Sequence, residues 1–137
     1  MRNFAVAIRF VVLLLGLNLL AISAPFAEES EMDMDLMQTI EDTNDSLTSN
    51  VSLEDADAAT ADAQTLNELF TVVVEHYQKD LAAGNDVAEA VKLSEKSKKL
   101  SGDIISQVKA GDFESAANSA TELSRTCKTC HNFYKED

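Results

Sequence analysis

The stretch TLNELFTVVVEHYQKDLAAGND, residues 65–86, decides the fold. Its three consecutive valines, taken alone, would suit a β-strand. The apolar residues around them recur instead every three or four positions, at Leu66, Phe70, Val73 and Tyr77. That spacing is the period of an amphipathic α-helix. The segment AAGND that follows should end this helix and cap the next one, so a helix over about residues 56–82 is predicted.

The same period predicts three more helices, over about residues 32–49, 87–109 and 113–135. The only proline is Pro25, so nothing in the body of the chain forbids a helix interior. Gly102 lies inside the helix predicted over residues 87–109, where it costs about 1 kcal/mol relative to alanine, and this favours close packing or a mild kink there. Two short turns and one longer first connection complete an all-α, antiparallel four-helix bundle.

The first 27 residues have the three-part layout of a secretory signal peptide. A positively charged start is followed by an apolar core over residues 10–22, then by small residues and an abrupt change to acid. Such a core is short of the ~20 residues that span a bilayer. We therefore expect cleavage after Ser23 or Ala27, export to the periplasm, no stable membrane span after signal removal, and a bundle domain over residues 28–137.

Acidic residues dominate what remains after cleavage. Loss of the two arginines of the signal peptide leaves nine bases against 24 acids, a net charge of −15, which disfavours nucleic acid as a partner. Residues 28–78 contain 14 acids and no Lys or Arg, so a partner near that half should be basic, with an association that salt weakens. We interpret the lysines at 92, 96, 98 and 99 chiefly as a solvated helix face, with a docking patch for an acidic partner as the alternative.

The chemistry-bearing motif lies near the end of the chain. TCKTCHNFY, residues 126–134, holds the only two cysteines, Cys127 and Cys130, with His131 directly after the second. On a helix these three positions share one face. They also continue the apolar stripe of the fourth predicted helix, so the two cysteines should face the core.

Several chemistries use such a group. A thioredoxin-like site needs CxxC at a junction between a strand and a helix, and no strand is predicted before it. A zinc site needs a fourth ligand, and His76 is the only other histidine. A disulfide across three residues of one helix has poor geometry. The remaining interpretation is haem c, bound covalently through Cys127 and Cys130, with His131 as the proximal iron ligand.

A four-helix bundle with CxxCH near the end of its last helix resembles the class II c-type cytochromes, cytochrome c′ and its low-spin relatives. Cys127-Lys128-Thr129-Cys130-His131 matches their attachment motif residue by residue. The resemblance implies that a distal ligand would come from the first helix. Three methionines lie there, at Met32, Met34 and Met37.

Met37 shares a helical stripe with Ile40, Asn44 and Leu47, and it is therefore the expected sixth ligand. Met34, one turn earlier, is the first alternative, and an open iron site is the second; the methionines could also merely fill space between helices. Ligation by His76 is a further alternative, although a lone histidine at a helix boundary is more often a surface residue.

A His/Met pair fills both axial positions, which suits single-electron transfer with redox partner proteins and no enzymatic bond rearrangement. The rival function is a five-coordinate cytochrome c′-like protein that binds or scavenges nitric oxide or carbon monoxide. Alanine-rich helix faces can pack closely and are compatible with a homodimer, while the acidic first half opposes face-to-face pairing there.

Overall fold

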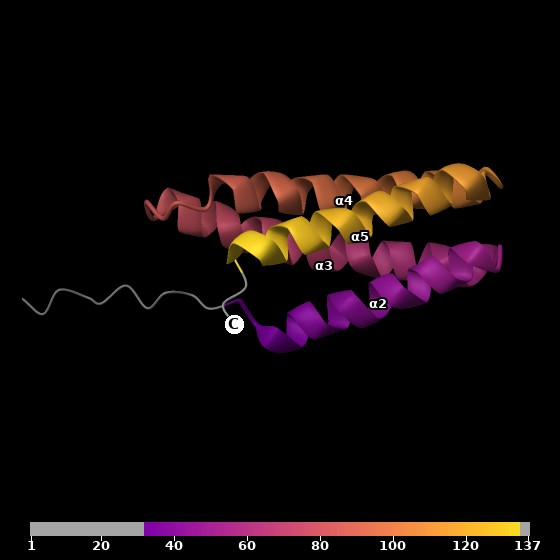
Figure 1. Ribbon diagram of the computed structural model, residues 1–137, viewed down its shortest axis with the longest axis horizontal. Coiled ribbons are helices and arrows are strands. Elements are labelled where there is room, and N and C mark those ends of the chain that lie inside the picture. The colour runs from indigo at the N-terminus through magenta and orange to yellow at the C-terminus, as the bar shows by residue number, and fades with distance from the viewer. Residues whose placement is uncertain (1–31, 135–137) are drawn as a thin grey trace, which may run out of the picture.

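The computed structural model describes residues 32–134, which form four α-helices joined by short turns. The helices are α2 (Met34–Ser52), α3 (Ala56–Ala82), α4 (Ala88–Lys109) and α5 (Phe113–Tyr134). Successive helices run antiparallel, and the described part of the chain contains no strand, so the predicted all-α bundle is confirmed (Figure 1). The expected signal peptide and its cleavage sites lie outside the described residues, as do residues 135–137.

Each helix contacts two neighbours. α3 packs against α2 and α4, and α5 packs against α4 and α2, so the side of the bundle between α2 and α5 lies opposite the side between α3 and α4. The start of α2, the end of α5 and the turn between α3 and α4 all lie at the same end of the bundle (Figure 1). Within residues 32–134, no helix combines the length and the apolar character that crossing a bilayer requires.

The core is built from the apolar stripes predicted for the four helices. Each helix contributes one large aliphatic side chain with 0% exposure: Leu47, Leu66, Ile104 and Leu123. Burying such a side chain stabilises the fold by roughly 1.5–3 kcal/mol. Small residues on the same stripes are fully or almost fully buried, and they let the helix backbones approach closely: Ala59, Ala63, Ala116 and Ala120.

Two details differ from the sequence-based expectation. α2 continues to Ser52 rather than ending near residue 49, because Val51 is only 3% exposed and packs into the core. The connection to α3 is therefore shorter than expected. The AAGND segment ends α3, with Gly84 at φ 96°, but it does not cap α4: the N-cap residue is Val87, which makes no side-chain cap hydrogen bond.

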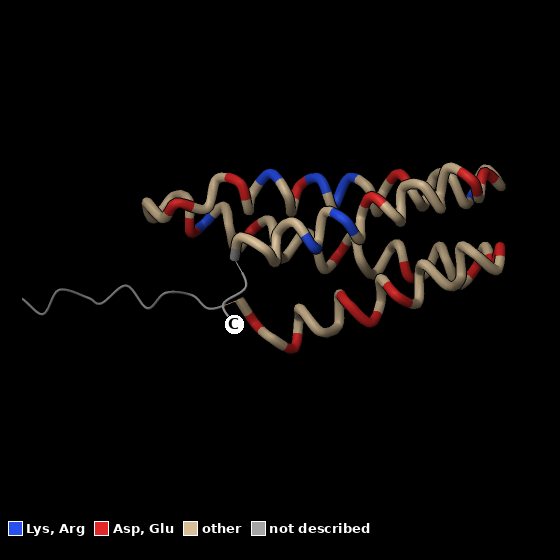
Figure 2. The backbone as a smooth tube through the Cα atoms, viewed as in Figure 1, with Lys and Arg blue, Asp and Glu red and all other residues tan. Residues whose placement is uncertain are grey.

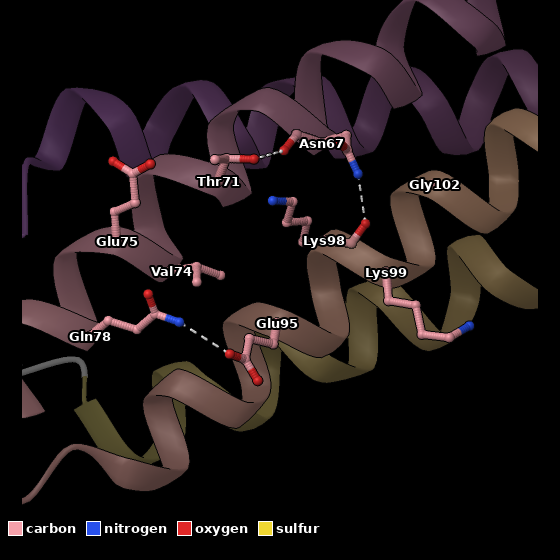
Figure 3. A pocket seen from close by; sticks show the side chains of 9 residues that line it. All are labelled: Asn67, Thr71, Val74, Glu75, Gln78, Glu95, Lys98, Lys99 and Gly102. Atoms are coloured by element: carbon pink, nitrogen blue, oxygen red, sulfur yellow. Dashed lines mark hydrogen bonds between the residues drawn. The ribbon is translucent and has the colours of Figure 1, made fainter.

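Gly102 does not mark a close approach between helices. A β-carbon built on Gly102 would meet Asn67 Nδ2 at 3.7 Å, an ordinary van der Waals distance, and α4 runs unbroken through this position. Asn67 Nδ2 instead donates a hydrogen bond to the Lys98 carbonyl oxygen at 2.8 Å (Figure 3). The expectation of close packing at Gly102 is therefore wrong.

Replacement of this glycine should stabilise the protein. We expect Gly102→Ala to raise the free energy of unfolding by about 0.5–1 kcal/mol, because alanine loses less conformational entropy in a helix. Gly111→Ala should instead lower it by roughly 1–2 kcal/mol, because Gly111 has φ 73°, which strains a residue with a β-carbon. Urea denaturation of the two variants would measure both changes, and a destabilising Gly102→Ala would contradict the packing described here.

Candidate functional site

The final turns of α5 carry the CxxCH motif. α5 begins after Asp112, whose Oδ1 accepts a hydrogen bond from the Ser115 backbone N–H at 3.0 Å. Three turns further on, Leu123 is buried in the core, and this fixes which face of the helix points inward. Cys127, Cys130 and His131 follow on that side and are half-buried, while Lys128 and Thr129 between them are exposed. The predicted common face of the three residues is therefore turned toward the bundle.

Both thiols are held in their protonated form. Burial, with smaller contributions from Cys130 and Glu41, raises the pKa of Cys127 from 9.0 to about 11. Burial also raises the pKa of Cys130. A dithiol that exchanges disulfides works through a thiolate of lowered pKa. The pKa of each of the two free cysteines is raised rather than lowered, and this disfavours a thioredoxin-like role.

One hydrogen bond sets the register of α2 against α5. Asn44 Nδ2 donates to Ser124 Oγ at 3.0 Å, so these two residues face each other at the same level of the antiparallel pair. Two residues that are seven positions apart on one helix are separated by about two turns and lie on almost the same face. Seven residues toward the start of α2 and seven toward the end of α5 lead to Met37 and His131. The structure thus places these two residues at one level, on the sides of α2 and α5 that face each other.

The first turns of α2 and the residues just before them are held to the bundle by apolar packing, through Met32, Leu36, Met37 and Ile40. Among the described residues, no hydrogen bond or ion pair joins residues 32–43 to another helix, whereas Ser46 Oγ and Asn50 Nδ2 bind Asp62 on α3 at 2.7 and 2.8 Å. The backbones of α2 and α5 diverge toward the end that carries Met37 and His131 (Figure 1). Met37 still packs against the core, but Met34 is 74% exposed.

The remaining candidate ligand lies on neither α2 nor α5. His76 lies on α3, where its Nε2 is 3.3 Å from Asp80 Oδ2 and its ring meets Tyr77 edge to face at 5.2 Å. Among residues 32–134, no three His, Cys, Asp or Glu side chains are arranged to hold a metal ion on their own.

Two contributors near the motif were not predicted from the sequence. Glu41 lies one turn before Asn44 and acts electrostatically on Cys127, and Ser124 accepts the hydrogen bond that aligns the helices. Asn44 Oδ1 is buried and has no partner among the described residues, a situation that water or a ligand ordinarily resolves. The roles of Glu41 and Ser124 depend on how α2 is aligned with α5, and the sequence alone does not show this alignment.

A hollow in the surface lies on the opposite side of the bundle, between α3 and α4 (Figure 3). Most of the residues that line it have polar or charged side chains, and Gln78 Nε2 donates a hydrogen bond to Glu95 Oε1 at 3.2 Å. None of the predicted site residues lines it.

Comparisons with protein-family models, with curated proteins and with solved structures find no match to this chain. The function is therefore argued from the motif on α5 and from its geometry relative to α2.

The raised thiol pKa of Cys127 should make the chain without haem less stable at high pH. A pKa of 9.0 unfolded and about 11 folded means that the folded state binds the proton more tightly, so this stabilisation is complete below pH 9 and is lost as pH rises to 11. The loss should amount to about 2–3 kcal/mol.

The test compares urea denaturation of this chain and of Cys127→Ala between pH 8 and pH 11, both produced without export so that no haem is attached. The difference in unfolding free energy between them should shrink across this range, and parallel pH profiles would contradict the burial of the Cys127 thiol.

Proposed function

We propose that this chain is an exported c-type cytochrome that carries single electrons through a covalently attached haem. One observation carries the proposal: Cys127, Cys130 and His131 share the inward side of α5, and Met37 lies at the level of His131 on the facing side of α2. Two thiols, an imidazole and a thioether are the donors that a His/Met haem c needs.

The residues present fit this group. Cys127 and Cys130 would hold the haem through two thioether bonds, and His131 and Met37 would bind its iron. The position of Met37 supports this assignment, because it packs against the core on the same stripe as Asn44, which donates a hydrogen bond to α5. The exposed Met34 is less suited to ligation than the half-buried Met37.

When bound, the haem would supply a one-electron change between ferrous and ferric iron. The protein's contribution would be to keep His131 and Met37 in place in the two oxidation states, so that little rearrangement accompanies electron transfer. A methionine sulfur and exclusion of water both favour the ferrous form and raise the potential. This role involves redox partner proteins and no bond rearrangement, and it agrees with the expected export to the periplasm, where covalent haem would be attached.

The absorption spectrum of the exported protein tests the proposal. We expect sharp ferrous bands, a weak far-red band of the ferric form from iron bound to sulfur, and no response to carbon monoxide. Met37→Ala should abolish the far-red band and make the ferrous protein bind carbon monoxide, because one axial position loses its ligand. Met34→Ala is the matched control and should leave the spectrum unchanged, since that side chain is 74% exposed.

Other outcomes would change the assignment. Broad high-spin bands that respond to carbon monoxide in the unaltered protein would contradict ligation by Met37 and favour gas binding. Loss of the far-red band in Met34→Ala alone would transfer the ligand role to Met34, and an exported protein without haem would contradict both functions.

A further inference from the structure

Acidic residues lie on every helix, whereas the basic residues are concentrated on two of them (Figure 2). Among the described residues, α2 carries acids and no Lys or Arg, whereas seven of the eight Lys and Arg residues lie on α4 or α5. α4 and α5 are neighbours, and α2 packs against α3 and α5. The bases are therefore gathered on one part of a protein whose net charge is −13.

Three of these bases lie around the contact between α4 and α5, and a fourth, Lys128, lies further along the outer side of α5. Lys96 Nζ is 2.5 Å from Glu122 Oε1, which places these two residues at the same level of the antiparallel pair. One turn away on α4 lies Lys92, and the next turns of α5 carry Arg125 and Lys128. All four side chains are exposed. We call Lys92, Lys96, Arg125 and Lys128 the basic face.

Two acids form ion pairs with bases of this surface. Glu89 lies 3.1 Å from Lys92, and Glu122 is shared between Lys96 and Arg125, whose Nη1 is 3.9 Å from Glu122 Oε2. Lys128 makes no ion pair with any described residue. Glu95 is exposed on α4 between Lys92 and Lys96, and Glu41 of α2 acts on Cys127, the neighbour of Lys128. Within the basic face, the positive charge without an ion-pair partner among the described residues is therefore that of Lys128, on α5.

The basic face lies outside the turns that hold the candidate haem ligands. Lys128 stands between Cys127 and Cys130 in the chain and is exposed, while the two cysteines are half-buried. A molecule bound at Lys128 would be separated from the proposed haem mainly by α5 itself. Because electron transfer slows steeply with distance, this is a favourable place for exchange.

We propose that the basic face is the docking surface for an acidic redox protein, which exchanges electrons with the haem across α5. This inference rests on the proposed function. Charge complementarity selects a protein with a local acidic patch: a nucleic acid or an anionic membrane would extend beyond the face and meet the acids elsewhere on the bundle. Beyond a Debye length of about 8–10 Å, those acids are largely screened from a compact partner.

The reaction of the ferrous protein with small oxidants of opposite charge tests this surface. One electron passes from the haem iron to the probe, so ferrous iron becomes ferric while hexacyanoferrate(III) or tris(phenanthroline)cobalt(III) is reduced. If exchange occurs at the basic face, the rate with the anionic hexacyanoferrate should fall as salt increases, although the net charge predicts the reverse. The rate with the cationic cobalt complex should rise with salt.

A pair of double variants locates the effect. Arg125→Glu with Lys128→Glu should slow the reaction with hexacyanoferrate roughly tenfold at low salt, a change within the range of electrostatic steering. Lys79→Glu with Lys109→Glu makes the same change in net charge away from the face, and its rate should stay within about twofold. Redox-inert poly-L-glutamate should compete with hexacyanoferrate for the unaltered protein but not for the first variant.

The contrary outcomes are distinct. A haem protein that reacts faster with hexacyanoferrate as salt increases, or equal slowing in both double variants, would overturn the docking surface alone. Binding to phosphatidylglycerol vesicles that is lost in Arg125→Glu with Lys128→Glu would assign the face to a membrane, and a salt-sensitive dimer lost in that variant would assign it to a second copy. A chain without haem would react with neither probe, and both proposals would then fail.

Discussion

The register of α2 against α5 is the constraint on which the candidate site depends. A shift of α2 by one residue would move Met37 by 1.5 Å along the helix and rotate it by about 100°, which would turn it away from α5. The hydrogen bond from Asn44 to Ser124 fixes this register, but one such bond is worth only about 0.5–1.5 kcal/mol. Most of the stabilisation of this alignment comes from the buried stripe of α2, at Ile40, Leu47 and Val51.

The contact of α5 with its other neighbour, α4, includes small side chains. Hydroxyl residues are buried in the described parts of α4 and α5, at Ser94, Ser97, Ser101 and Thr126. Each hydroxyl donates to a backbone carbonyl of its own helix at 2.8–3.0 Å, so none remains unsatisfied. Small side chains that need no hydrogen-bond partner on the neighbouring helix let the two helices pack closely. α5 is thereby supported along its length by α4, and the first turns of α2 are the part that diverges.

Much of this arrangement could be predicted from the sequence, because helical period and turn residues are local signals. Leu66, Phe70 and Val73 indicated one face of α3, and all three are buried. The end of α2 was predicted too early because the burial of Val51 depends on contacts with other helices. The cap of α4 was mispredicted because the AAGND segment serves the end of α3.

In the candidate site, too, the local features could be predicted from the sequence and the features that depend on tertiary contacts could not. The spacing of Cys127, Cys130 and His131 on one helix is a local property, and their shared side followed from the sequence. The proximity of Glu41 to Cys127, and the level of Met37 relative to His131, depend on how two helices distant in sequence are aligned. The stripe that contains Met37 and Asn44 gave the correct face of α2 without giving its partner. Exposure separates Met34 from Met37, and exposure is a tertiary property.

The burial of Cys127 also bears on how such a protein is made. In the folded bundle this thiol is half-buried, so an enzyme that joins it to a haem vinyl group could not reach it easily. Under the proposed function, both sulfurs must then react while α5 is still separate from α2. Biogenesis would follow a fixed order, with secretion first, cofactor ligation second and closure of the bundle last.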